Sequence, residues 1–97
     1  MNGSYNTDLS IEEKCEQLRK VVSTNMKNKR QELNFTQEEL AERVEMSVEA
    51  IGKLETGRQW FSVESLVRVC FALKTTPCQL FLDREHDYLI PAAEVLG

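Results

Sequence analysis

The sequence contains little of what most metal sites and active sites are built from. It has one histidine, His86, and three cysteines, Cys15, Cys70 and Cys78. A lone histidine cannot form a histidine pair, and the cysteines lack the two-residue gaps of zinc sites. We expect all three cysteines to be packing residues rather than redox sensors. Because no phosphate loop or nucleophile–base pair is visible either, the sequence predicts neither an enzyme nor a bound metal or cofactor.

Long apolar runs are also missing, and none approaches the roughly 18–20 residues that span a bilayer. The chain begins Met1-Asn2-Gly3-Ser4, without the basic and then apolar order of a signal peptide. We therefore expect a cytoplasmic protein. With 97 residues and 41% hydrophobic content, the chain has room for one small domain with its own core.

The net charge of −4 is unevenly distributed along the chain. Residues 1–16 and 83–97 each contain one basic and four acidic residues, whereas residues 17–82 contain ten basic and eight acidic ones. The densest positive cluster is Lys27, Lys29 and Arg30. This cluster is either a solvated helix face or a set of phosphate contacts, because basic residues matter for nucleic acid only where they can reach phosphates.

Helical periodicity and capping residues predict five helices and no strand. The first, over 11–33, begins at a capping box of Ser10 and Glu13 and carries an apolar stripe at spacings of three and four. The others are a short helix over 36–45, a third over 48–56, a fourth after Ser62 and a fifth after Thr76-Pro77. The prediction is an all-α domain over 11–82, with a flexible N-terminus (1–10) and a C-terminal tail (83–97).

The two short helices are the most informative feature. Each is too short to be stable alone. Ile51 and Leu54 face the core, which leaves Val48, Glu49, Gly52 and Lys53 on the opposite side of the third helix. Patterning alone fits two structures equally well, an ordinary helical hairpin and a helix-turn-helix.

Residues 22–82 resemble the lambda-repressor/Cro-like helix-turn-helix family, also called the xenobiotic response element family. Residues 36–41 (TQEELA) resemble the start of its second helix, and residues 47–57 (SVEAIGKLETG) resemble its recognition helix. The spacing of Ser62, Leu66, Val69 and Leu73 resembles its fourth helix, and residues 76–81 (TPCQLF) resemble its fifth. The resemblance implies a five-helix DNA-binding domain of a bacterial or phage regulator associated with the nucleoid, here with an extended first helix.

The resemblance also implies roles for individual residues. Ser47, Val48, Glu49 and Lys53 would approach the bases in the major groove of double-stranded DNA. Gln37 and Arg30 match family positions near the phosphates, and Lys27 and Arg58 are further phosphate candidates. Arg30 would also pair with Glu55, either as a buried ion pair that orients the helices or as a loose surface pair.

Two residues depart from the family pattern. Glu45 stands in the turn where glycine is common, and a left-handed backbone there would cost roughly 1 kcal/mol unless the turn is rebuilt. Glu49 places a carboxylate on the reading face, where only a cytosine amine offers it a partner. We therefore expect weak non-specific binding and a strong dependence on DNA sequence.

Other features have simpler interpretations. Trp60 and Phe61 are expected to cover the core, although Trp60 could instead lie against the DNA backbone. Asp83, Glu85 and Asp87 lack the glycine and distant glutamate of a calcium loop and are expected to be a solvated tail. Two apolar groups outside the domain are candidates for a dimer contact: Tyr88, Leu89 and Ile90 before Pro91, and the helix-one stripe of Ile11, Cys15 and Leu18.

The sequence thus predicts a DNA-binding transcriptional regulator, most simply a repressor. We expect a homodimer, because one recognition helix reads only about 4–5 base pairs and two half-sites lie about 34 Å apart. The alternative is an antitoxin that neutralises a partner toxin, or another protein-interaction module with the same fold.

Overall fold

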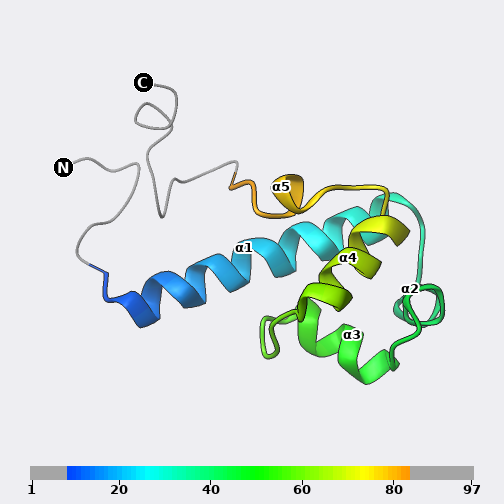
Figure 1. Ribbon diagram of the computed structural model, residues 1–97, viewed down its shortest axis with the longest axis horizontal. Helices are drawn as coiled ribbons and strands as arrows, with labels where there is room; N and C mark the ends of the chain where they lie inside the picture. The colour runs from blue at the N-terminus through cyan, green and yellow to red at the C-terminus, as the bar shows by residue number, and fades with distance from the viewer. Residues whose placement is uncertain (1–8, 84–97) are drawn as a thin grey trace.

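The computed structural model describes residues 9–83, and all regular secondary structure in this range is helical. The chain forms α1 (Ile11–Glu32), α2 (Gln37–Val44), α3 (Val48–Glu55), α4 (Val63–Ala72) and α5 (Pro77–Leu80). Figure 1 shows α1 as the long element, with the other four helices gathered around its C-terminal half. The predicted all-α, five-helix architecture is confirmed.

Each helix begins at a side chain that satisfies a free backbone N–H group. Ser10 and Glu13 form the predicted capping box of α1, and Thr36 and Glu39 form that of α2. Ser62 and Ser65 form a third capping box at α4, and single hydroxyl acceptors cap the remaining helices, Ser47 for α3 and Thr76 for α5. Short polar residues therefore set the helix boundaries, as the sequence predicts.

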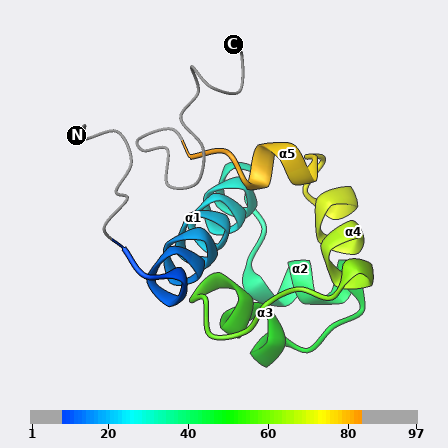
Figure 2. The same cartoon turned by 60° about the vertical axis from the view of Figure 1, so that its left-hand side comes forward.

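The core lies between the C-terminal half of α1 and the four shorter helices. Its fully buried side chains include Val22 and Met26 of α1, Leu40 and Val44 of α2, Ile51 and Leu54 of α3, Val69 and Leu73 of α4, and Leu80 of α5. Figure 2 shows α2, α3 and α4 enclosing this space on one side of α1. Every helix contributes to the core, so the two short helices are held by packing rather than by their own stability.

The first turns of α1 extend beyond the other helices (Figure 1). Ile11 is consequently 72% exposed, and Cys15 is exposed as well. Cys78, at the second position of α5, is also exposed, whereas Cys70 is buried. The prediction that all three cysteines are packing residues was therefore wrong for Cys15 and Cys78, because a helical stripe is buried only where another element packs against it.

Side-chain contacts attach α5 and the α3–α4 loop to the rest of the domain. The Asn25 Nδ2 group of α1 donates to the carbonyls of Leu80 (2.7 Å) and Leu82 (2.8 Å), which ties down the end of α5. The ring of Trp60 meets Phe61 and Phe81 edge to face, at centroid distances of 5.6 and 5.8 Å. Trp60 therefore covers part of the core, as expected, although 40% of it is exposed.

The predictions for the tail residues Glu85, His86 and Asp87, and for Tyr88, Leu89, Ile90 and Pro91, lie outside the described residues, as does most of the segment 1–10. Within residues 9–83, no helix combines the length and apolar character needed to cross a membrane.

Candidate nucleic-acid interface

The turn between α2 and α3 is built around a left-handed residue. Glu45 has φ 59° and ψ 46°, so the turn is not rebuilt to avoid this conformation. The N–H of Met46 donates to the carbonyl of Ala41 (2.9 Å), which closes the end of α2. A residue other than glycine in this conformation costs roughly 1 kcal/mol. The turn therefore contains local strain that other contacts must offset.

Arg68 of α4 makes contacts that favour this conformation. Its Nη1 group donates to the carbonyl of Val44 (3.1 Å) and to Oε1 of Glu45 (2.9 Å). Its Nη2 group donates to Glu64 one turn earlier on α4 (2.7 Å). Hydrogen bonds to Glu45 and Glu64 raise the pKa of the Arg68 guanidinium. We call this set of contacts the Arg68 clasp.

Sequence reasoning did not find the Arg68 clasp. The only local signal is the spacing of Glu64 and Arg68 on one helix, which indicates an ordinary i,i+4 pair. The contact with Glu45 joins residues 23 positions apart and depends on how α4 packs beside the turn. The clasp fixes the end of α2 and the α2–α3 turn with respect to α4.

A buried ion pair holds the C-terminal end of α3. Nε of Arg30 donates to Oε2 of Glu55 (2.6 Å), and Nη2 donates to Oε1 (3.1 Å). The side chains of Arg30 and Glu55 are 10% and 2% exposed. Nη1 of Arg30 donates to the carbonyl of Phe35 (2.6 Å), and Nε2 of Gln37 donates to Oε1 of Glu55 (3.0 Å). The buried form of the pair, rather than a loose surface pair, is the one present.

Two more residues position the end of α3. The buried Ser23 hydroxyl of α1 donates to the carbonyl of Leu54 (2.8 Å). Gly57 follows the helix with φ +76°, and a β-carbon there would lie 3.4 Å from Ser23 Oγ. Glycine is favoured here by the backbone conformation, because 3.4 Å is close to an ordinary van der Waals contact. α1 therefore contacts α3 through Ser23 as well as through Arg30.

The outward side of α3 is open. Figures 1 and 2 both show this helix at the edge of the domain opposite α5. Ser47 and Glu49 are exposed, Val48 is 39% exposed, and Lys53 is half-buried. A β-carbon built on Gly52 meets nothing within 4 Å. Among the described residues, then, no part of the chain covers the side of α3 on which the four predicted base-reading residues lie.

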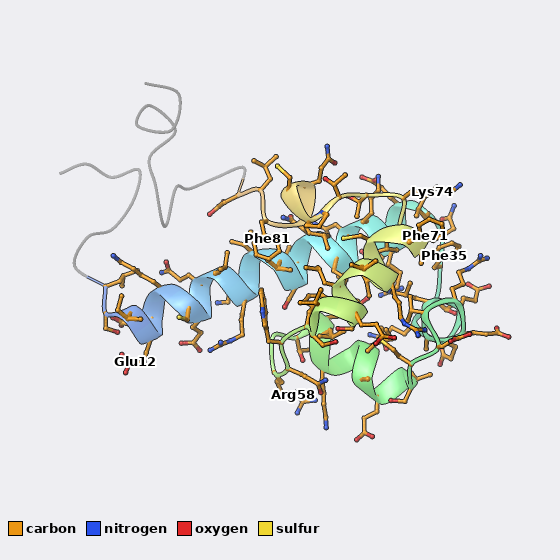
Figure 3. All side chains as sticks on the ribbon, in the orientation of Figure 1. Glu12, Phe35, Arg58, Phe71, Lys74 and Phe81 are labelled. Atoms are coloured by element: carbon orange, nitrogen blue, oxygen red, sulfur yellow. The ribbon has the colours of Figure 1, made fainter. Side chains whose placement is uncertain are left out.

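The predicted phosphate contacts occupy different environments. Lys27 and Arg58 are exposed, and Figure 3 shows Arg58 projecting on the same side of the domain as α3. Lys27 lies four residues after Ser23 and three before Arg30, on the side of α1 that contacts α3. Gln37 is half-buried at the start of α2. Arg30 is only 8% exposed, and its guanidinium is engaged by Glu55 and Phe35.

The geometry therefore favours one of the two roles predicted for Arg30. The ion pair with Glu55 is present, whereas a buried and fully engaged guanidinium has little surface left for a phosphate. Over the same described segment, no group of three or more His, Cys, Asp or Glu side chains is placed to hold a metal ion.

Known proteins share this architecture. The ClgR clp gene regulator from Corynebacterium glutamicum is 32% identical over 65% of this chain and 67% of its own, with a TM-score of 0.62. The hypothetical transcription factor NHTF from Neisseria aligns over 98% of this chain and 97% of its own, with 24% identity and a TM-score of 0.64. The restriction-modification controller protein C.AhdI from Aeromonas hydrophila aligns over 65% of this chain and 96% of its own chain, with 22% identity and a TM-score of 0.62.

The latter two similarities, at under 25% identity, show the fold alone. No curated protein matches the chain. The sequence model of the helix-turn-helix family matches residues 26–80, which include α2, α3 and α4. The chain thus belongs to the helix-turn-helix family, in its lambda-repressor/Cro-like form.

Proposed function

We propose that this protein is a sequence-specific, double-stranded-DNA-binding regulator of transcription that acts as a repressor and reads the major groove with α3. Family membership and the similarity to ClgR, a clp gene regulator, support DNA-binding regulation. The observation that carries the proposal is the open outer side of α3. The C-terminal end of this helix is held by contacts from α1, and the turn before it is held by Arg68.

Base recognition is assigned to residues near the start of α3. Ser47 and Glu49 lie at the N-terminus of the helix, where they approach base edges first. Val48 packs on a thymine methyl, and Glu49 accepts from a cytosine amine. Lys53, one turn further on, donates to guanine or to a phosphate. Each good base contact provides about 1–3 kcal/mol of discrimination.

Phosphate contacts fix the position of α3 on the duplex. We assign them to Lys27 and Arg58, which are exposed, and to Gln37 together with the N-terminal amides of α2. Arg30 acts indirectly, because its ion pair with Glu55 orients α3 and its contact with the Phe35 carbonyl orients the loop before α2. Bound as a homodimer across two half-sites, the protein would occlude a promoter and so repress it.

Selection from a random duplex library tests the proposal. The expected result is enrichment of a two-fold symmetric motif, followed by loss of affinity for that motif in Lys53→Ala and Gln37→Ala. Lys29→Ala is the matched control. Lys29 also carries one positive charge, but it lies on the α5 side of α1, and within residues 9–83 its ion-pair partner is Glu32, at 3.3 Å. The control should bind nearly as well as the wild type.

The same experiment can reject the proposal. If no motif is enriched even at low salt, the open side of α3 does not read DNA. That outcome would favour the alternative of a protein-interaction module, such as an antitoxin. Equal losses for Lys29→Ala and Lys53→Ala would show that only the overall charge matters, which contradicts base reading by α3.

A further inference from the structure

The outer side of α4 carries a stripe of exposed apolar residues that the DNA-binding site does not use. Val63 is 81% exposed, Val67 58% and Phe71 87%. The three residues are spaced four apart, so they lie along one side of the helix. Single exposed apolar residues are ordinary, but a contiguous stripe of them marks an interaction surface.

The stripe borders a groove at the C-terminal end of α4. Val67, Phe71 and Ala72 supply its apolar lining, and Arg43 and Lys74 are cations on its rim. Arg43 is held in place by the ring of Phe35, whose centroid lies 4.2 Å from the guanidinium carbon. Figure 3 shows Phe35, Phe71 and Lys74 gathered at the same end of the domain.

Charge differs between the two ends of the stripe. Near the N-terminal end of α4, Glu45 and Glu64 share the single cation Arg68, which leaves this end net acidic, and the cations Arg43 and Lys74 border the C-terminal end. If two such helices pack antiparallel, Phe71 of each meets Val63 of the other, and Val67 meets Val67 near the two-fold axis. The same arrangement brings the acidic end of each helix toward the basic end of the other. The surface is therefore complementary to itself, as a two-fold contact requires.

We propose that the occupant of this surface is a second copy of the chain and that antiparallel pairing of α4 forms the homodimer. Three apolar side chains per copy make a small apolar centre, whereas a standard interface buries about 800 Å² on each partner. The dimer is therefore weak, dissociating on the order of micromolar concentration, and DNA with two half-sites strengthens it.

This surface differs from both contacts predicted from the sequence. Of those, the tail residues Tyr88, Leu89 and Ile90 lie outside the described residues. On α1, Leu18 packs against the core, which leaves Ile11 and Cys15 as a much smaller exposed group. The α4 interface rests on the proposed function only because a two-fold symmetric dimer suits a two-fold symmetric DNA site. The interface itself can be tested without DNA.

Sedimentation equilibrium of the full chain over a range of concentrations tests the α4 interface. Val67→Glu should raise the dimer dissociation constant at least about tenfold, because it places two like charges at the two-fold axis. Ile11→Glu is the matched control, with the same substitution at an exposed aliphatic residue of α1, and it should leave the constant unchanged. Circular dichroism confirms that both variants remain folded, as expected for exposed positions.

A charge reversal tests the direction of packing. Lys74→Glu should weaken the dimer, because antiparallel pairing brings Lys74 toward the acidic end of the partner helix. The same reversal at Lys20, an exposed lysine of α1, should leave the association unchanged. The α4 interface is overturned if Val67→Glu leaves dimerisation unchanged, if Ile11→Glu abolishes it, or if the wild type remains monomeric with and without DNA. A monomer that reads DNA would still enrich a single half-site in the library selection, whereas a protein that does not read DNA would enrich no motif, so failure of the interface and failure of DNA reading are distinguishable.

Discussion

Substitution of Gly52 by alanine should make the domain more stable. Gly52 lies inside α3, where glycine is less favourable than alanine by about 0.8–1.0 kcal/mol. The added methyl group meets nothing within 4 Å, so no steric cost offsets this gain. The free energy of unfolding should therefore rise by about 1 kcal/mol. For a domain of this size, that change raises the melting temperature by about 4–8 °C.

The same methyl group should weaken DNA binding. Gly52 lies on the outer side of α3 between Glu49 and Lys53, so a methyl group there separates the helix backbone from the duplex. Displacing one base contact costs about 1–3 kcal/mol, which corresponds to a loss of affinity of about tenfold or more. Thermal unfolding measures the first effect, and fluorescence anisotropy with the selected duplex measures the second.

Gly57→Ala provides the matched comparison. This glycine has φ +76°, and a β-carbon there lies 3.4 Å from Ser23 Oγ. The substitution should lower the free energy of unfolding by about 1 kcal/mol or more. A loss of stability in Gly52→Ala would show that the outer side of α3 is covered. A gain in stability with unchanged DNA affinity would show that this side does not face DNA.

Four further outcomes are expected. Arg30→Met should lower the free energy of unfolding, measured in urea, by about 3–5 kcal/mol, because it leaves Glu55 buried and unpaired. Adding Glu55→Leu should recover much of this loss, and a double variant as unstable as the single one would contradict the reasoning. Glu45→Gly should raise the melting temperature, because relief of a left-handed residue, about 1 kcal/mol, exceeds the value of an exposed ion pair; a fall would show that the ion pair dominates. Arg58→Ala should weaken binding to all duplexes alike and reduce the log–log salt slope by about 1 per chain, whereas an unchanged slope would remove Arg58 from the phosphate contacts. A thiol reagent should modify the two exposed cysteines at once and Cys70 only on unfolding. Burial raises the pKa of the Cys70 thiol, so the protein should lose stability as the pH rises through that raised pKa, and Cys70→Ala should abolish this part of the alkaline destabilisation.

The helices and their boundaries could be predicted from the sequence because local chemistry determines them. The capping boxes at Ser10 and Thr36 both depend on residues within one turn. Which apolar side chains are buried could be predicted less accurately. The periodicity of Ile11 and Cys15 is as regular as that of Val22, but only the latter has other helices packed against it.

In the candidate site, too, some features could be predicted from the sequence and others depend on how the helices pack. The open side of α3 follows from which of its residues face the core, and the Arg30–Glu55 pair follows from the family resemblance. The Arg68 clasp has no local signature, because its contact with Glu45 depends on the packing of α4. The exposed side of α4 was missed for a related reason: Val63, Val67 and Phe71 have the hydrophobicity of core residues, and only the position of α4 shows that they are exposed.

The contacts around α3 have a consequence for how this protein can diversify. Ser23 and Arg30 hold the C-terminal end of the helix, and Arg68 holds the turn before it, without any of them lying on its outer side. Val48, Glu49 and Lys53 make none of these anchoring contacts, so they can be exchanged with little effect on folding. Under the proposed function, new operator preferences would therefore arise by single substitutions, with the scaffold inherited intact.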